Sequence, residues 1–124
     1  MATKKPTPKT KMKLVKHMLA ITANSSLELK VKRTGGLNTT HALVVSTGTD
    51  TEAFSDSQMT PGPATKALNG ANSYVIVWTV AFVEDGTATL NVVVLDDQGQ
   101  KHDRAPVPVT GKAGDIAKRV VVIG

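Results

Sequence analysis

Six lysines and no acidic residue lie within the first seventeen positions of the chain. They are Lys4, Lys5, Lys9, Lys11, Lys13 and Lys16. Positive charges on an extended segment neutralise phosphates and release counterions, so this pattern is typical of salt-dependent, sequence-tolerant nucleic-acid binding. An acidic membrane surface or an acidic protein partner would be attracted by the same charges, and a merely solubilising terminus has the same composition. No arginine or aromatic residue is interleaved with these lysines to stack on bases.

Catalytic chemistry has little support in the rest of the chain. His102, Asp103 and Arg104 form the one place where a base, a carboxylate and a guanidinium are adjacent. Neighbours in a strand point to opposite faces, so His102 and Arg104 would share a side that Asp103 does not. The chain contains no G-x-S-x-G, G-x-x-x-x-G-K-[ST] or G-x-G-x-x-G motif. We therefore expect no enzymatic activity and no cofactor.

Metal binding is also not indicated. Asp50, Glu52 and Asp56 could offer oxygen ligands to Ca²⁺, as in a calcium-dependent or carbohydrate-binding surface module, but their spacing does not match an EF-hand loop. A solvated acidic loop is the favoured interpretation. The chain has no cysteine, which excludes disulfides, thiol chemistry and cysteine-ligated zinc.

The composition favours strands over helices. Val, Thr and Ile account for 16, 16 and 4 of the 124 residues, while Glu occurs only three times. β-Branched residues suit a pleated sheet and are restricted in a helix. The length suits a single domain, and the charge divides it into a basic, disordered arm over 1–16 and one folded domain over 17–124.

No apolar stretch reaches the eighteen or so residues that a membrane span needs. Lys16 and His17 interrupt the apolar stretch near the start of the chain, which argues against a secretion signal. These features predict a protein of the cytoplasm or of an assembled particle.

Alternating apolar residues predict strands in six segments, which are 27–32, 40–47, 73–83, 88–95, 101–109 and 116–123. Segment 11–23 fits a helix or a strand, and the β-rich surroundings favour the strand. Pro106 and Pro108 restrict their strand to an edge or to pairing on one side. Asp85-Gly86 predicts a tight hairpin between the third and fourth segments. Segment 48–72 shows no clear strand and is either a functional loop or contains an element that the pattern misses, such as a short strand near Ala53-Phe54 or a helical turn near Ala64–Leu68.

Segment 73–83 is apolar on both of its faces. Tyr74, Trp78 and Phe82 point one way, together with Ile76 and Val80, and the opposite side is also mostly valine and alanine. Such a strand is covered on both sides or lies at a subunit contact. The three aromatic residues are interpreted as core, with a protein interface as the alternative.

Short strands separated by turn signals predict a single antiparallel β-sandwich of about seven strands, immunoglobulin-like in general architecture. A sandwich of this kind implies no particular activity. The extended arm and the apolar run Val120–Ile123 favour a non-enzymatic structural or adaptor subunit, such as a component of a virion-like assembly, with itself or another protein as partner. Nucleic-acid binding through the lysine arm is the alternative.

Overall fold

The computed structural model describes residues 10–12, 18–19, 25–60 and 62–124, and the chain in it is all-β, with 67% strand and 4% helix. In chain order the elements are β1 (Thr10–Met12), β2 (Met18–Leu19), β3 (Ser26–Gly35), β4 (Asn38–Ser46), β5 (Thr51–Ser55), α1 (Asp56–Met59), β6 (Ala64–Ala67), β7 (Tyr74–Phe82), β8 (Gly86–Leu95), β9 (Lys101–Gly111) and β10 (Ile116–Ile123).

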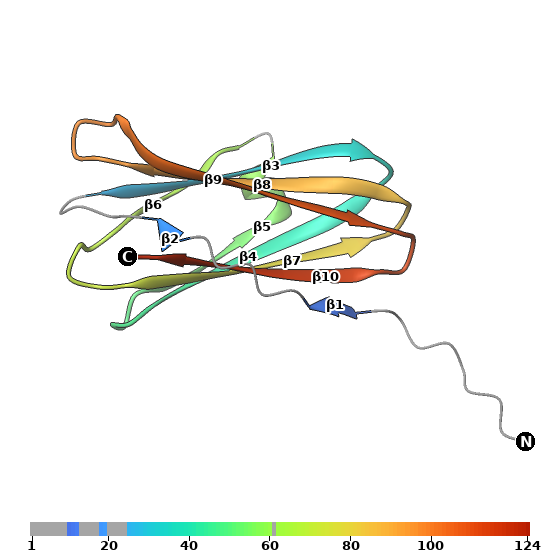
Figure 1. Cartoon of the computed structure of the whole chain (residues 1–124), viewed down its shortest axis with the longest axis horizontal. Helices are drawn as coiled ribbons and strands as arrows, with labels where there is room; N and C mark the ends of the chain where they lie inside the picture. Colours follow the sequence, from blue (N-terminus) through green and yellow to red (C-terminus); the bar gives the residue numbers. More distant parts are fainter. Residues whose placement is uncertain (1–9, 13–17, 20–24, 61) are drawn as a thin grey trace, which may run out of the picture.

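Two sheets face each other as the layers of a sandwich (Figure 1). The larger sheet has the order β1-β10-β7-β4-β5, with β2 also paired to β10, and the smaller sheet has the order β6-β3-β8-β9. All pairs are antiparallel except β1 and β2, which run parallel to β10. The predicted all-β sandwich is confirmed, with eight strands in its two main layers instead of about seven.

The two layers share one pattern of connections. Each contains one hairpin, β8–β9 in the smaller sheet and β4–β5 in the larger, and two further strands that arrive from the opposite layer. The two orders correspond strand by strand, with β6, β3, β8 and β9 of the smaller sheet matching β10, β7, β4 and β5 of the larger. Each matched pair is four strands apart when β3 to β10 are numbered as a closed ring. Most connections therefore cross between layers, and the sheets depend on pairing between segments far apart in sequence.

The core lies between the inner faces of the two sheets. β7 contributes the alternate residues Tyr74, Ile76, Trp78, Val80 and Phe82, all of them buried. They face the buried residues of β3 and β8, which are Leu27, Leu29, Val31, Ala88, Leu90, Val92 and Val94. Each fully buried side chain of this size contributes about 1.5–3 kcal/mol. The aromatic residues on β7 are thus interior residues, and their side chains are not available to a partner.

The predicted Asp85-Gly86 hairpin is wrong. β7 and β8 belong to different sheets, and both sides of β7 are already occupied by β4 and β10. The turn instead crosses one end of the sandwich, where the Asp85 carbonyl accepts from Gly36 N (3.0 Å) and its carboxylate accepts from Ala113 N (2.8 Å). A Cβ on Gly86 would lie 2.9 Å from Gly36 N, so glycine is required by close backbone approach. Asp85 and Gly86 therefore suit a connection between the two sheets and not a hairpin between paired strands.

Segment 48–72 contains elements that its sequence pattern does not reveal. β5 lies at Ala53 and Phe54, as one interpretation of the pattern suggests, and it pairs with β4. The helical turn predicted near Ala64–Leu68 is wrong, because Ala64–Ala67 is a strand paired with β3 and the helical turn occurs at Asp56–Met59. β6 is short and its inward positions include a lysine, so its apolar alternation is weak.

Two further expectations concern strand edges. The strand favoured over 11–23 is described at Thr10–Met12 and Met18–Leu19, and the first of these lies inside the predicted disordered arm.

β9, with Pro106 and Pro108, is an edge strand that pairs only with β8, as predicted. Because proline lacks an N–H donor, these two positions cannot template a further strand.

An ion pair joins the two sheets at their β5 and β6 edges. Lys66 points inward from β6, is 7% exposed, and donates from Nζ to Asp50 Oδ1 (2.6 Å) and Glu52 Oε1 (3.4 Å). The hydrogen bond from Lys66 holds the pKa of Asp50 below its ordinary value of 3.8. Burial alone would lower the pKa of Lys66, but the hydrogen bond and charge of Asp50, with help from Glu52, outweigh it and raise that pKa above 10.5.

We expect the variant Asp50→Asn to lower the free energy of unfolding at neutral pH. A carboxyl whose folded pKa is depressed contributes stability above its unfolded value, and that contribution is lost as the pH falls through the folded pKa. The deficit of Asp50→Asn should therefore be full above about pH 4 and shrink toward pH 2. Urea unfolding across this range measures it, with Asp97→Asn in the exposed β8–β9 turn as control. A deficit independent of pH would contradict the ion pair.

Candidate functional site

The outer face of the larger sheet is apolar across four strands. Register places Val122, Val75 and Val45 in one row, with Thr51 at its end. The next row contains only apolar residues from β10, β7, β4 and β5. We call the apolar members of these two rows the valine face, which consists of Leu43, Val45, Ala53, Val75, Val77, Val120 and Val122.

The valine face points away from the core because strand side chains alternate. Val45 and Val75 are 37% and 36% exposed, Ala53 is exposed, and the other four members are half-buried by their own neighbours. Among the residues that the structure describes, no second layer covers this surface. Scattered surface valines are ordinary, but contiguous apolar side chains on a sheet face mark an interaction surface.

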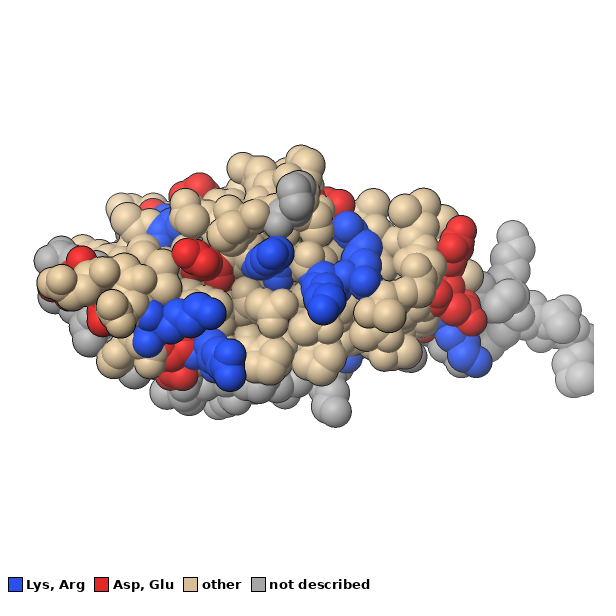
Figure 2. Space-filling model, turned by 90° about the horizontal axis from the view of Figure 1, so that it is seen from above, with Lys and Arg blue, Asp and Glu red and all other residues tan. Residues whose placement is uncertain are grey.

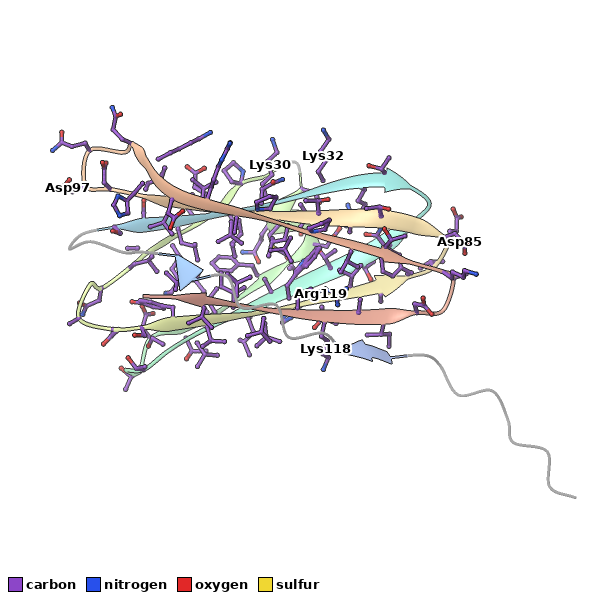
Figure 3. The ribbon with its side chains drawn as sticks, in the orientation of Figure 1. Lys30, Lys32, Asp85, Asp97, Lys118 and Arg119 are labelled. Carbon is purple, nitrogen blue, oxygen red and sulfur yellow. The ribbon has the colours of Figure 1, made fainter. Side chains whose placement is uncertain are left out.

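Polar residues border the valine face on one side. The adjacent row across the sheet consists of Lys118, Thr79, His41 and Ser55. Figure 3 shows Lys118 pointing outward from the larger sheet. An apolar centre with a polar border is the usual composition of a protein contact.

The sequence contains a signal for this surface in two places. Segment 73–83 is apolar on both faces, and Val120–Ile123 is an uninterrupted apolar run. In the structure one face of β7 and of β10 is buried in the core, and the opposite face of each strand contributes to the valine face. Leu43 and Ala53 join them only through strand pairing, which the sequence pattern does not reveal.

The lysine arm lies mostly outside the described residues. Of its six lysines only Lys11 falls in a described stretch, as part of β1. The arm remains a candidate for binding phosphate or an acidic partner on the strength of its composition.

The acidic residues of segment 48–72 do not form a common site. Asp50 and Glu52 bind Lys66 at the sheet edges, whereas Asp56 pairs with Arg33 and accepts from the backbone and hydroxyl of Thr40 (3.1 and 2.9 Å). Over residues 25–60 and 62–124 no three His, Asp or Glu side chains are grouped to hold a metal ion. All three carboxylates link the segment to the sheets.

The His102-Asp103-Arg104 triplet lies on β9 where the strand is irregular. Val94 is opposite Asp103 and Leu95 is opposite Lys101, so His102 is an extra residue in a β-bulge. His102 and Arg104 are exposed, and Asp103 is half-buried. This exposure agrees with the alternation expected for the triplet, and the bulge changes the facing of the residue before it, Lys101.

Arg119 is a residue whose placement the sequence pattern does not predict. It lies opposite Trp78 in the β10–β7 register and so faces the interior, as Figure 3 shows. Its guanidinium donates to the Lys118 carbonyl (2.9 Å), and burial lowers its pKa. The Nε1 atom of Trp78 is buried without a hydrogen-bond partner in the described structure.

Within the described residues, no helix has the length and apolar character needed to cross a membrane. Comparison of the chain with protein families, with curated proteins and with solved structures gave no match in any of the three. The function must therefore be inferred from the surfaces themselves.

Adjacent residues of β7 should respond differently to truncation. Ile76 faces the core, so Ile76→Ala should lower the free energy of unfolding by about 2–5 kcal/mol. Val77 faces outward, and Val77→Ala should cost no more than about 1 kcal/mol in the monomer. Urea unfolding at low protein concentration measures both. Equal losses would mean that the valine face is covered within a single chain.

Proposed function

We propose that the chain is a non-enzymatic structural or adaptor subunit that acts through protein–protein contacts, and that a second copy of the chain docks on its valine face. The single observation that carries this proposal is the row-by-row continuity of apolar side chains across β10, β7, β4 and β5. A face without charged side chains in its two central rows can pair with itself without burying an unpaired charge. Two-fold pairing of identical patches is the commonest form of self-association.

The size of this surface indicates how tightly it would bind. The valine face covers two rows of side chains on four strands spaced about 4.8 Å apart, or about 14 Å by about 19 Å, which gives a flat face of about 270 Å². Stable interfaces bury about 800 Å² on each partner, so the contact is weak when made once. Weak contacts of this kind suit a subunit of a larger, virion-like assembly, in which many are made together.

The immunoglobulin-like architecture inferred from the sequence belongs to the same proposal. Two facing sheets around a single interior tryptophan support it, and such a sandwich is a rigid scaffold that presents surfaces to partners.

Charge on the valine face should abolish self-association. Val45 and Val120 lie on strands separated by β7, and replacing both with lysine places unpaired charges in the proposed contact. We expect wild-type protein to shift toward a dimer as its concentration rises, and Val45→Lys/Val120→Lys to weaken this association at least about tenfold. Light scattering coupled to size-exclusion chromatography across a concentration series measures the effect.

The matched control adds the same two charges to the opposite sheet. Thr34 and Thr65 are exposed residues of β3 and β6, and Thr34→Lys/Thr65→Lys should associate like the wild type. A wild-type chain that stays monomeric at every concentration would refute docking of a second copy. Equal weakening by both double variants would attribute association to general charge and also contradict the proposal.

A second candidate function, sequence-tolerant nucleic-acid binding through the arm, rests on the six lysines of residues 1–17. Each phosphate contact to a single strand contributes about 0.7 to the slope of log affinity against log salt. We expect Lys4→Gln/Lys5→Gln/Lys9→Gln to reduce that slope by about 2 for a labelled oligothymidylate, measured by fluorescence anisotropy. An unchanged slope would exclude the arm as the phosphate-binding element.

A further inference from the structure

The outer face of the smaller sheet carries a groove on the opposite side of the molecule from the valine face. Its volume is about 590 Å³, and β3, β8 and β9 supply most of its lining, with Pro63 at one margin. A liquid water occupies about 30 Å³, so the groove accommodates far more than one small ion. Its size is within the range of sites that bind organic ligands.

Positive side chains line this groove. Lys30, Lys101 and Arg104 contribute to its walls, and Glu28 is its one acidic lining residue. Lys32 lies two residues beyond Lys30 on the same face of β3 and is exposed. Figure 2 looks down on this sheet and shows Lys and Arg side chains gathered on it, and Figure 3 shows Lys30 and Lys32 pointing away from the sheet. Among the described residues, none of these four cations has a carboxylate within ion-pair distance.

The register explains how the cations converge. Lys30 lies opposite Asn91, which in turn lies opposite Pro106, while Arg104 lies opposite Val93 one row away. The floor of the groove is therefore the neutral strand β8, with Lys30 on the β3 side and Arg104 on the β9 side, while Glu28 lies on β3 in the row of Arg104. β3 and β9 are separated by two strand intervals, or about 10 Å, which defines a narrow channel.

The β-bulge at His102 completes the cationic wall. In a regular strand Lys101 and Arg104, three positions apart, would point to opposite faces. The extra residue changes this alternation, so that Lys101 lies opposite Leu95 and Arg104 opposite Val93, both on the outer face. Bulges commonly re-aim side chains next to functional sites.

We propose that this groove binds the phosphate backbone of a single-stranded nucleic acid. The three cations in the walls of the groove, with Lys32 beside them on β3, suit a linear series of anions, whose binding is driven by counterion release. A channel about 10 Å wide admits a single nucleic-acid strand but is too narrow for a duplex to enter. All four aromatic residues of the chain are buried, so no aromatic platform stacks on bases and binding is tolerant of sequence.

A peptide is a poorer fit to the same groove. Extended peptides gain affinity mainly by adding a strand to an open sheet edge. The groove lies on a sheet face, where the backbone groups of β8 are already paired with β3 and β9. Recognition therefore depends on side-chain charge and on Asn91 at the floor. The inference does not rest on self-association, because the valine face belongs to the other sheet.

Two charge-matched double variants of the full chain test the proposal. Lys30→Gln/Arg104→Gln removes one cation from each wall, while Lys112→Gln/Lys118→Gln removes two exposed or half-exposed cations elsewhere. Two lost contacts of slope about 0.7 each lower the salt slope by about 1.4, which is about 25-fold in affinity at about 0.1 M salt. Labelled oligothymidylate and fluorescence anisotropy measure both quantities, and circular dichroism confirms that each variant is folded.

Each outcome decides the question. A loss near 25-fold with the reduced slope for the groove variant, and little change for the control, supports the site. Equal losses for both variants, no effect of the groove variant, or no binding by the wild-type chain would overturn it. Polyglutamate that competes as well as unlabelled oligothymidylate would overturn the assignment to nucleic acid in favour of an acidic protein. The arm variant Lys4→Gln/Lys5→Gln/Lys9→Gln separates the two contributions, since the groove effect should persist in its background.

Discussion

The burial of two facing apolar sheet surfaces around Trp78 is the constraint on which the rest of the structure depends. Trp78 lies at the middle of β7, which is paired on both sides in the larger sheet, and its side chain is fully buried against the smaller sheet. Its indole N–H is buried and has no hydrogen-bond partner among the described residues. Because the inner positions of β3, β7 and β8 are committed to this core, every alternate residue of those strands must face outward.

The two outer faces consequently present two candidate surfaces among the described residues, and their chemistry differs. One presents the valine face, and the other presents a groove with Lys30, Lys101 and Arg104 in its walls. An apolar face favours contact with another apolar surface, whereas unpaired cations favour a multivalent anion. The two surfaces lie on opposite sheets, so the proposed self-association and the proposed nucleic-acid binding do not block each other.

Charged residues at the margins hold the connecting segments against the sandwich. Lys66 links the two sheets through Asp50, and Asp56 joins α1 to Arg33 and Thr40. At the far end Asp85 binds the backbone of two neighbouring connections. Acidic residues that suggest a metal-binding loop in the sequence are therefore occupied by cations and amides, which explains why they do not gather into one site.

Local patterns in the sequence were sufficient for the all-β class, for the main strands and for the edge position of β9. Alternation of apolar residues reflects which face of a strand is buried, and prolines limit pairing, so both can be recognised without knowing the fold. The valine face was visible only as two apolar segments. Tertiary structure alone decided that Asp85-Gly86 crosses between layers, that Ala64–Ala67 pairs with β3, and that a bulge aligns Lys101 with Arg104. Strand partners and register depend on contacts between distant segments, and a single extra residue changes which face a side chain occupies.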